Sequence, residues 1–234
     1  MDLQIENYKD KHEYISESGT RSVVYLMDCI EGLKQIPEKY FELAIVDPPY
    51  GIDIAKAGKV GGDKLGKVKN YGAKEWDRQS PIDDYFRQLF EISYNQIVWG
   101  ANHFISKIPF DSSCWIVWDK DNSGAFADCE LAWTSFKSAV RKFAYRWNGM
   151  LQQNMKDKEE RIHPTQKPVA LYEWLIKNYA KENDKILDTH LGSGSSRIAA
   201  CKANLPFMGF ELDEDYFKAS VKRYEQYVAQ KSLF

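Results

Sequence analysis

The sequence predicts an α/β fold with a mainly parallel, twisted sheet and helices on both of its faces. The run FELAIV (41–46) is compact and apolar, as is typical of a parallel strand buried on both faces. A second strand leads into a glycine-rich turn within KILDTHLGSGSS (185–196), and FMGFELD (207–213) leads into a terminal helix. Alternation of strands and helices implies a parallel sheet. The 234 residues suit one domain with a full hydrophobic core.

Apolar periodicity and capping residues predict the remaining elements. Asp28 is placed to cap a short helix that ends near Pro37. The segments 130–136 and 141–147 alternate enough to predict two further strands, both antiparallel. The other predicted elements are strands at 22–27, 96–100 and 113–119, and helices at 81–95, 168–180, 197–204 and 213–231.

Three stretches lack such patterns. Residues 1–20 are predicted to be a poorly structured N-terminal arm, and residues 148–162 a polar connection. Residues 51–80 are rich in Gly and Lys and are predicted to be a long mobile loop, because loops of this length are usually functional or disordered. We find no internal repeat, so residues 1–234 are expected to form one domain.

Composition excludes several classes of protein. The four cysteines are scattered without a CxxC pair, and the four histidines are dispersed, so no metal site is expected. No apolar run approaches the roughly 20 residues that span a bilayer. The polar N-terminus lacks a signal-peptide core. We therefore expect a soluble, cytoplasmic protein without a membrane partner.

Positive charge is concentrated locally although the formal net charge is −2. Residues 52–76 carry six lysines against three acidic residues. A nucleic-acid binder need not be basic overall if its positive charge is clustered. Lys64, Lys67 and Lys69 are therefore candidate contacts to DNA phosphates. The alternative is a solvated loop without a partner.

The glycine-rich turn after the strand at 185–188 indicates a ligand site. Gly192 and Gly194 allow the backbone to turn tightly and to approach a ligand closely. Glu211 ends the next strand, where an acidic residue in nucleotide-binding α/β folds accepts hydrogen bonds from ribose hydroxyls. Arg197 takes the place of the third glycine of a dinucleotide motif, which favours a cofactor without a pyrophosphate. A tight turn without a ligand remains the alternative.

The turn DPPY (47–50) follows the buried strand at 41–46, and ligands bind beyond the carboxyl ends of such strands. Pro48 and Pro49 make the turn rigid. The Asp47 carboxylate and the Pro48 carbonyl are two acceptors, and Tyr50 is an aromatic face. Together they suit an amine on a flat ring. The alternative is a polar turn with Tyr50 packed in the core.

These motifs together resemble a known family. DPPY at 47–50, HPTQKP at 163–168 and DTHLGSGS at 188–195 look like the amino-group DNA methyltransferases, which methylate adenine N6 or cytosine N4. The catalytic motif precedes the cofactor turn, which resembles the permuted beta class, and FADCELAWTSF (126–136) resembles small phage and prophage members. The resemblance implies a Rossmann-like methyltransferase fold with S-adenosylmethionine as the methyl donor.

The resemblance also implies roles for individual residues. Asp47, Pro48, Pro49 and Tyr50 would receive a flipped base, and Glu211 would bind the ribose of the cofactor. Lys167 is the best candidate for the methionine carboxylate of the cofactor. His190 stands where the family usually has Phe, and a packed histidine is favoured over a catalytic one. The other residues implied at the cofactor are Asp188, Gly192, Ser193, Gly194, His163 and Thr165.

The expected function is methylation of adenine N6 in double-stranded DNA with base flipping, as in restriction-modification systems. An acid at the first motif position favours adenine within the family. Cytosine-N4 methylation is the alternative, and a catalytically silent DNA-binding module is the alternative from another class. The short region 137–162, with Arg141 and Arg146, would recognise the target. A homodimer and a companion restriction endonuclease are further possibilities that the family raises.

Overall fold

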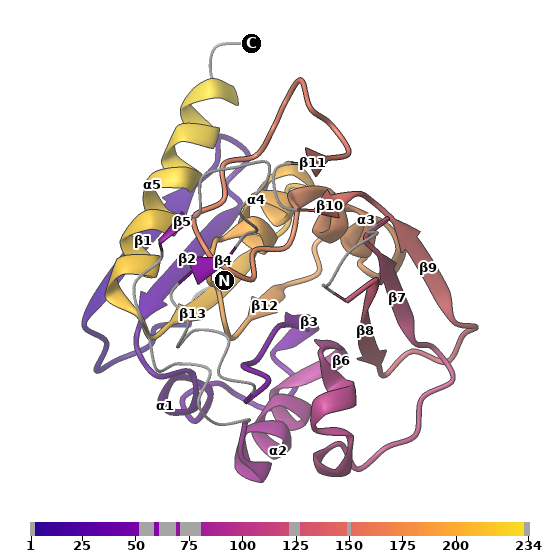
Figure 1. Cartoon of the computed structure of the whole chain (residues 1–234). Coiled ribbons are helices and arrows are strands. Elements are labelled where there is room, and N and C mark those ends of the chain that lie inside the picture. The colour runs from indigo at the N-terminus through magenta and orange to yellow at the C-terminus, as the bar shows by residue number, and fades with distance from the viewer. Residues whose placement is uncertain are drawn as a thin grey trace.

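The computed structural model describes residues 3–51, 59–60, 69–70, 81–121, 127–148 and 151–231. Over these residues the chain forms a nine-stranded sheet in the order β1-β2-β13-β12-β3-β6-β8-β7-β9 (Figure 1). The strands of this sheet are β1 (Asp10–Ile15), β2 (Arg21–Leu26), β3 (Phe41–Val46), β6 (Ser93–Trp99), β7 (Ile116–Asp119), β8 (Cys129–Thr134), β9 (Arg141–Ala144), β12 (Ile186–Asp188) and β13 (Phe207–Glu211). The α-helices are α1 (Cys29–Leu33), α2 (Asp83–Ile92), α3 (Val169–Tyr179), α4 (Ser195–Lys202) and α5 (Glu214–Lys231).

The middle of the sheet is parallel, as the sequence predicts. β2, β13, β12, β3 and β6 are each parallel to their neighbours in that order. β8 is antiparallel to both β6 and β7, which confirms one of the two predicted antiparallel strands. The prediction is wrong for β9, which is parallel to β7. β8 ends beside the start of β7, and β9 begins there. β9 therefore runs in the same direction as β7.

The N-terminal segment is more ordered than the sequence predicts. The expectation of a poorly structured arm over residues 1–20 is wrong for β1, which pairs antiparallel with β2 at the edge of the sheet. β1 carries few apolar residues, so its sequence lacks the usual strand pattern. Its backbone pairing is supported by an ion pair between Glu13 and Arg21, and by the Tyr14 ring at 5.7 Å from that of Tyr224.

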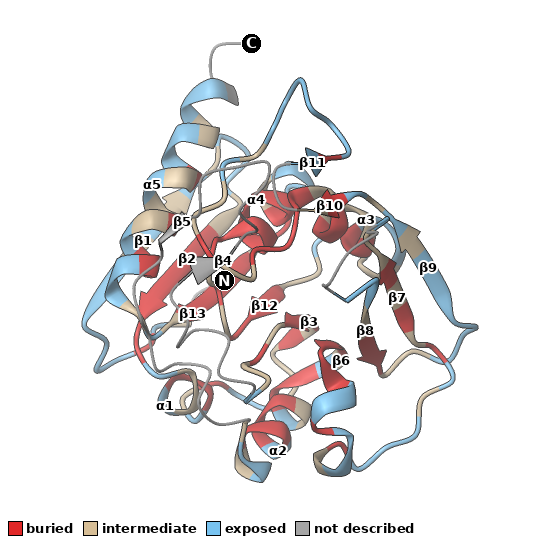
Figure 2. Ribbon diagram, in the orientation of Figure 1, coloured by how far each residue is buried: buried red, intermediate tan, exposed pale blue. Residues whose placement is uncertain are grey.

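Helices cover both faces of the sheet, and each face has its own apolar core (Figure 2). One core packs α3, α4 and α5 against the sheet and includes Leu175, Ile198 and Phe217. The other packs α1 and α2 against the opposite face and includes Leu33 and Leu89. Because β3 is covered on both sides, five of its six residues are buried, which explains the apolar run at 41–46.

The start of helix α1 follows from the local sequence. The Asp28 carboxylate accepts a hydrogen bond from the Ile30 N–H at 2.7 Å and caps α1, as predicted. Arg197 on α4 is buried, with its guanidinium 3.8 Å from the centroid of the Tyr224 ring on α5. This side chain packs α4 against α5, so no glycine is required at position 197.

No helix in the described ranges is long and apolar enough to cross a membrane.

Two segments differ from the predicted loops. Within 51–80, the backbone of β4 (Lys59–Val60) pairs antiparallel with that of β5 (Lys69–Asn70). Most of this segment, including Lys64 and Lys67, lies outside the described residues. At the start of the predicted polar connection, which begins at residue 148, β10 (Trp147–Asn148) and β11 (Leu151–Gln152) form a second small antiparallel pair.

Candidate active site

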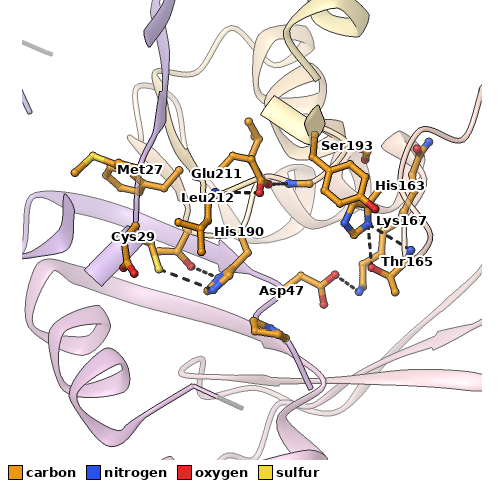
Figure 3. A pocket seen from close by; sticks show the side chains of 18 of the residues that line it. Met27, Cys29, Asp47, His163, Thr165, Lys167, His190, Ser193, Glu211 and Leu212 are labelled. Carbon is orange, nitrogen blue, oxygen red and sulfur yellow. Dashed lines mark hydrogen bonds and ion pairs between the residues drawn. The ribbon is translucent and has the colours of Figure 1, made fainter. Parts of the chain in front are cut away.

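The order of the strands brings the two principal motifs together. β3 and β12 are parallel neighbours, so the DPPY turn after β3 and the glycine turn after β12 lie at the same edge of the sheet. A cavity of about 210 Å³ opens between them and the ends of β2 and β13. Figure 3 shows Met27, Cys29 and His190 on one side of this pocket and His163, Thr165 and Lys167 on the other.

Asp47 is the residue of the DPPY turn that reaches into the pocket. One carboxylate oxygen, Oδ1, accepts a hydrogen bond from the Tyr50 hydroxyl at 2.8 Å. The other, Oδ2, lies 2.5 Å from Lys167 Nζ (Figure 3). Burial raises the pKa of Asp47, and the Lys167 ammonium opposes that effect. Pro49 also lines the pocket, whereas Pro48 and Tyr50 do not.

The Tyr50 ring packs against a glycine and a histidine. It stacks on the His103 imidazole, with centroids 4.9 Å apart and an angle of 15° between the planes. Gly100, which follows β6, has φ +66°, and a Cβ there would lie 2.0 Å from Tyr50 Cε1. Position 100 therefore requires glycine for its backbone conformation and for the ring beside it. Neither Gly100 nor His103 was predicted as a site residue.

Lys167 lies between two carboxylates, one of which was not predicted. Its Nζ is 2.5 Å from Asp47 Oδ2 and 3.0 Å from Glu130 Oε2, and its side chain is 2% exposed. Burial alone would lower the pKa of Lys167, but the two carboxylates raise it. Lys167 thus lines the pocket, as the resemblance implies, with its ammonium engaged at Asp47 and Glu130.

Glu130 is the main functional candidate that the sequence analysis missed. It lies on β8, and a second cation, Lys120, pairs with its Oε1. Although burial alone would raise its pKa, the Lys167 and Lys120 ammoniums lower the pKa of Glu130 to about 2. An acidic residue within the strand CELAWT was the signal in the sequence, because an unpaired carboxylate is unfavourable in a central strand.

The glycine turn and Glu211 form the other side of the pocket. Gly192 has φ +51° and Gly194 has φ +72°, so both occupy the left-handed region that favours glycine. The Gly192 N–H donates to Glu211 Oε2 at 2.8 Å. Burial raises the pKa of Glu211 to about 7, although three backbone N–H groups stabilise its ionised form. Ser193 also lines the pocket.

Asp188 supports the glycine turn through hydrogen bonds and does not line the pocket. Its carboxylate accepts hydrogen bonds from the Ser196 hydroxyl at 2.5 Å and from the His190 N–H at 3.0 Å. Burial raises the pKa of Asp188 to about 6. Gly194 does not line the pocket either, and it is the N-cap residue of α4.

The two histidines of the pocket are neutral at ordinary pH. Burial lowers the pKa of His163 and of His190 to about 3 each. The His163 Nδ1 lies 3.1 Å from the hydroxyl of Thr165, and its ring packs against Gly192. His190 Nδ1 lies 2.9 Å from the Thr189 hydroxyl, and its Nε2 faces Cys29 Sγ at 3.9 Å. His190 is therefore a neutral hydrogen-bonding part of the pocket wall.

Two of the predicted DNA contacts, Arg141 and Arg146, do not line the pocket. Arg141 is exposed at the start of β9. The Arg146 guanidinium forms an ion pair with Asp121 and donates to it through Nε at 2.8 Å. The side chains of Lys64, Lys67 and Lys69 are outside what the structure describes. The role of the lysine-rich segment therefore stays a prediction.

Methyltransferases are among the known proteins whose sequences or folds are similar to this chain. The Type II methyltransferase M.HinfI of Haemophilus influenzae is 27% identical over 242 residues, which is 84% of this chain and 66% of that relative's length. The putative DNA modification methylase TTHA0409 of Thermus thermophilus, solved with S-adenosyl-L-methionine, has a TM-score of 0.56 at 18% identity and covers 88% of this chain and 95% of its own.

The cytosine-N4-specific PvuII DNA methyltransferase has a TM-score of 0.59 at 16% identity, over 95% of this chain and 94% of its own. These structural likenesses confirm the predicted methyltransferase fold. A family model described as DNA methylase, N6_N4_Mtase, matches residues 95–222. Because this match spans more than half of the 234 residues and includes the glycine turn, the chain belongs to the N6/N4 DNA methylase family.

Proposed function

We propose that the protein transfers a methyl group from S-adenosylmethionine to the N6 amine of a flipped adenine in double-stranded DNA. One observation carries the proposal: the Asp47 carboxylate lines the same pocket as the glycine turn and Glu211. An acceptor for an amine thus lies in the pocket whose other wall suits a nucleoside cofactor. The order of the motifs, catalytic before cofactor turn, supports placing the enzyme in the beta class.

The pocket suits S-adenosylmethionine in its donor chemistry. Ionised Glu211 is an acceptor for ribose hydroxyls, and Ile30 and Leu212 supply apolar walls for the adenine ring. Gly192 lets the backbone approach the ligand. The absence of a pyrophosphate in this cofactor agrees with Arg197 at the third position of the motif. When bound, S-adenosylmethionine supplies an electrophilic methyl group on a sulfonium centre.

Asp47 performs the central chemical task in this proposal. Its carboxylate and the Pro48 carbonyl accept hydrogen bonds from the two N–H groups of the target amine. These contacts direct the nitrogen lone pair toward the methyl group. Asp47 also stabilises the positive charge that develops on the nitrogen, an electrostatic effect worth about 3–4 kcal/mol in comparable sites. The proton leaves the nitrogen after transfer, so no separate base is needed before attack.

The base must leave the duplex to reach Asp47. The Tyr50 ring stacks on the flipped base, a contact worth about 1–3 kcal/mol. Because His103 and Gly100 pack against Tyr50, the ring is held in place before the base arrives. Lys167 is assigned here to Asp47, because a role at the methionine carboxylate would require it to leave two ion pairs.

Cytosine-N4 methylation is the second candidate, because the PvuII enzyme with its similar fold is cytosine-N4-specific. Both reactions attack an exocyclic amine and use the same acceptors. The acid at position 47 favours adenine, following the family pattern. We also propose Lys64, Lys67 and Lys69 as phosphate contacts and Arg141 and Arg146 as target-recognition contacts. Neutralising the three lysines should flatten the salt dependence of DNA binding.

A homodimer and a companion restriction endonuclease complete the proposal. Sedimentation of the purified protein with and without DNA tests the dimer. A nuclease encoded beside this protein, cutting only DNA that this protein has not methylated, would identify the companion. A neighbouring nuclease that also cuts the methylated DNA would refute the proposal of a companion endonuclease.

The test of the function is a product analysis. The purified protein is incubated with labelled S-adenosylmethionine and unmethylated duplex DNA, which is then digested to nucleosides and analysed by mass. N6-methyladenine is expected, and N4-methylcytosine would change only the base. Binding of S-adenosylhomocysteine without any methylation of DNA would instead support the silent DNA-binding module.

A variant of the acceptor assigns the chemistry to the pocket. Asp47→Asn should lose turnover by roughly 10²–10³-fold and keep cofactor binding, because the side-chain shape stays while the charge is lost. Asp10→Asn, on the exposed edge strand β1, is the matched control and should turn over normally. Near-normal turnover in Asp47→Asn would refute the role of the carboxylate.

A further inference from the structure

A second carboxylate is built into the site beside the one that accepts the amine. Glu130 Oε2 lies 3.0 Å from Lys167 Nζ and 3.5 Å from the Tyr50 hydroxyl. Lys167 and Tyr50 are the same two groups that contact Asp47. Glu130 thus shares both partners of Asp47, although it comes from β8 on the far side of β6.

Asp47 does not have the Lys167 ammonium to itself. Asp47 and Glu130 both contact this buried ammonium. Lys120, with a side chain that is 18% exposed, pairs with the other oxygen of Glu130, so the cluster has two carboxylates and two ammoniums. Because Lys167 is shared with Glu130, it neutralises Asp47 less than a dedicated partner would, and a carboxylate that is only partly neutralised stabilises developing positive charge better.

Glu130 also helps to fix the position of Lys167. The Lys167 Nζ lies 2.5 Å from Asp47 Oδ2 and 3.0 Å from Glu130 Oε2, so the ammonium lies between two carboxylates and is not paired with Asp47 alone. Burial makes both contacts strong, since the Lys167 side chain is 2% exposed.

We propose that Glu130 is a positioning residue of the methyl-transfer site, which shares the Lys167 ammonium with Asp47 and so keeps that ammonium from neutralising Asp47 alone. The inference rests on the proposed function for its catalytic consequence, but the electrostatic coupling exists in the protein alone. A residue with only a structural role would change stability without changing the charge state of Asp47.

The coupling predicts a signed change in the titration of Asp47. Glu130 raises the pKa of Asp47 through its negative charge. Glu130→Gln removes that charge and leaves Lys167 to Asp47, so the pKa of Asp47 should fall. The groups that face Asp47 in the described structure, and that must be considered in the titration, are Lys167, Glu130, Tyr50, Tyr85, Tyr172 and Asp188.

The experiment measures turnover and titration in the full-length protein. In Glu130→Gln, kcat at saturating cofactor and DNA should fall roughly tenfold or more, with KM little changed. The acidic limb of the kcat–pH profile should move to lower pH. Lys120→Met should move it to higher pH, because Glu130 then loses its outer cation. Glu42→Gln, in an ion pair away from the pocket, is the control and should change neither.

A second measurement separates this inference from the function itself. The Asp47 carboxyl carbon is titrated by NMR in wild type and Glu130→Gln and assigned with Asp47→Asn. A lower pKa in Glu130→Gln supports the coupling even if no DNA is methylated, which would refute only the proposed function. An unchanged Asp47 titration overturns the inference. If Glu130→Gln does not fold, an Asp47 titration that fails to rise in Lys120→Met overturns it equally.

Discussion

Removal of Lys167 is the sharpest test of the electrostatics of the pocket. Lys167→Met keeps the length and apolar stem of the side chain but leaves Asp47 and Glu130 without their shared cation. Breaking a buried ion pair by removing one partner costs about 3–5 kcal/mol. Because Asp47 is 17% and Glu130 22% exposed, water partly solvates both carboxylates, so we expect the lower end, about 3 kcal/mol.

The pH dependence of this loss has a definite sign. Without Lys167, the folded-state pKa of Asp47 rises further above that of the unfolded chain, and the folded-state pKa of Glu130 rises from about 2. The folded variant then binds more protons than the folded wild type, so the stability lost in the variant increases as pH rises. The loss should be complete at pH 8 and should shrink as pH falls through the raised folded pKa values.

Urea denaturation at pH 8 and pH 5.5 measures both quantities. A loss of about 3 kcal/mol corresponds to a decrease in Tm of roughly 6–12 °C for a chain of this size. Lys185→Met is the matched control, because Lys185 pairs with Glu42 at 3.0 Å with both side chains about one third exposed. That pair should contribute at most about 1 kcal/mol. Equal losses in the two variants, or a loss in Lys167→Met that is independent of pH, would show that the buried cluster is not electrostatically coupled.

Three further predictions concern the pocket walls. The proposed ribose contact needs the ionised form of Glu211, whose pKa is about 7, so affinity for S-adenosylhomocysteine should be full well above pH 7 and decrease as pH falls through 7; calorimetry should find no such dependence in Glu211→Gln. Gly100→Ala should destabilise the fold by about 1–3 kcal/mol more than Gly19→Ala in urea, since both have positive φ but only position 100 meets the Tyr50 ring. His163, with a folded pKa of about 3 against 6.5 when unfolded, should show no imidazole titration by NMR between pH 5 and 8, and its contribution to stability should be lost as pH falls below 6.5.

The elements that the sequence predicted well are those whose periodicity is strong. The buried strand β3, the capped helix α1 and the amphipathic helix α3 lie close to their predicted positions. β1 was missed because an edge strand exposes most of its side chains, so apolar alternation is weak. The direction of β9 was wrong because strand direction depends on where the chain crosses the sheet, which local alternation does not encode.

The same distinction applies to the site. The position of Asp47, the glycine turn and Glu211 at one edge could be predicted, because each ends or directly follows a strand and the ends of parallel strands meet at one edge. Glu130 could not, because it lies within β8, and only the placement of β8 beside β6 brings it to Lys167. Gly100 and His103 were missed for a similar reason: their role is defined by the Tyr50 ring that packs on them.

The sequence by itself determined the class of fold, the two motifs of the pocket and the residue types available for an amine and a nucleoside cofactor. These properties follow from local periodicity and from residues adjacent to strand ends. Only the tertiary structure decided the partners of Lys167. These are Asp47, which lies 120 residues earlier in the chain, and Glu130 on β8. Contacts between distant segments depend on strand order, and strand order is set by the joint packing of both faces of the sheet rather than by any single segment.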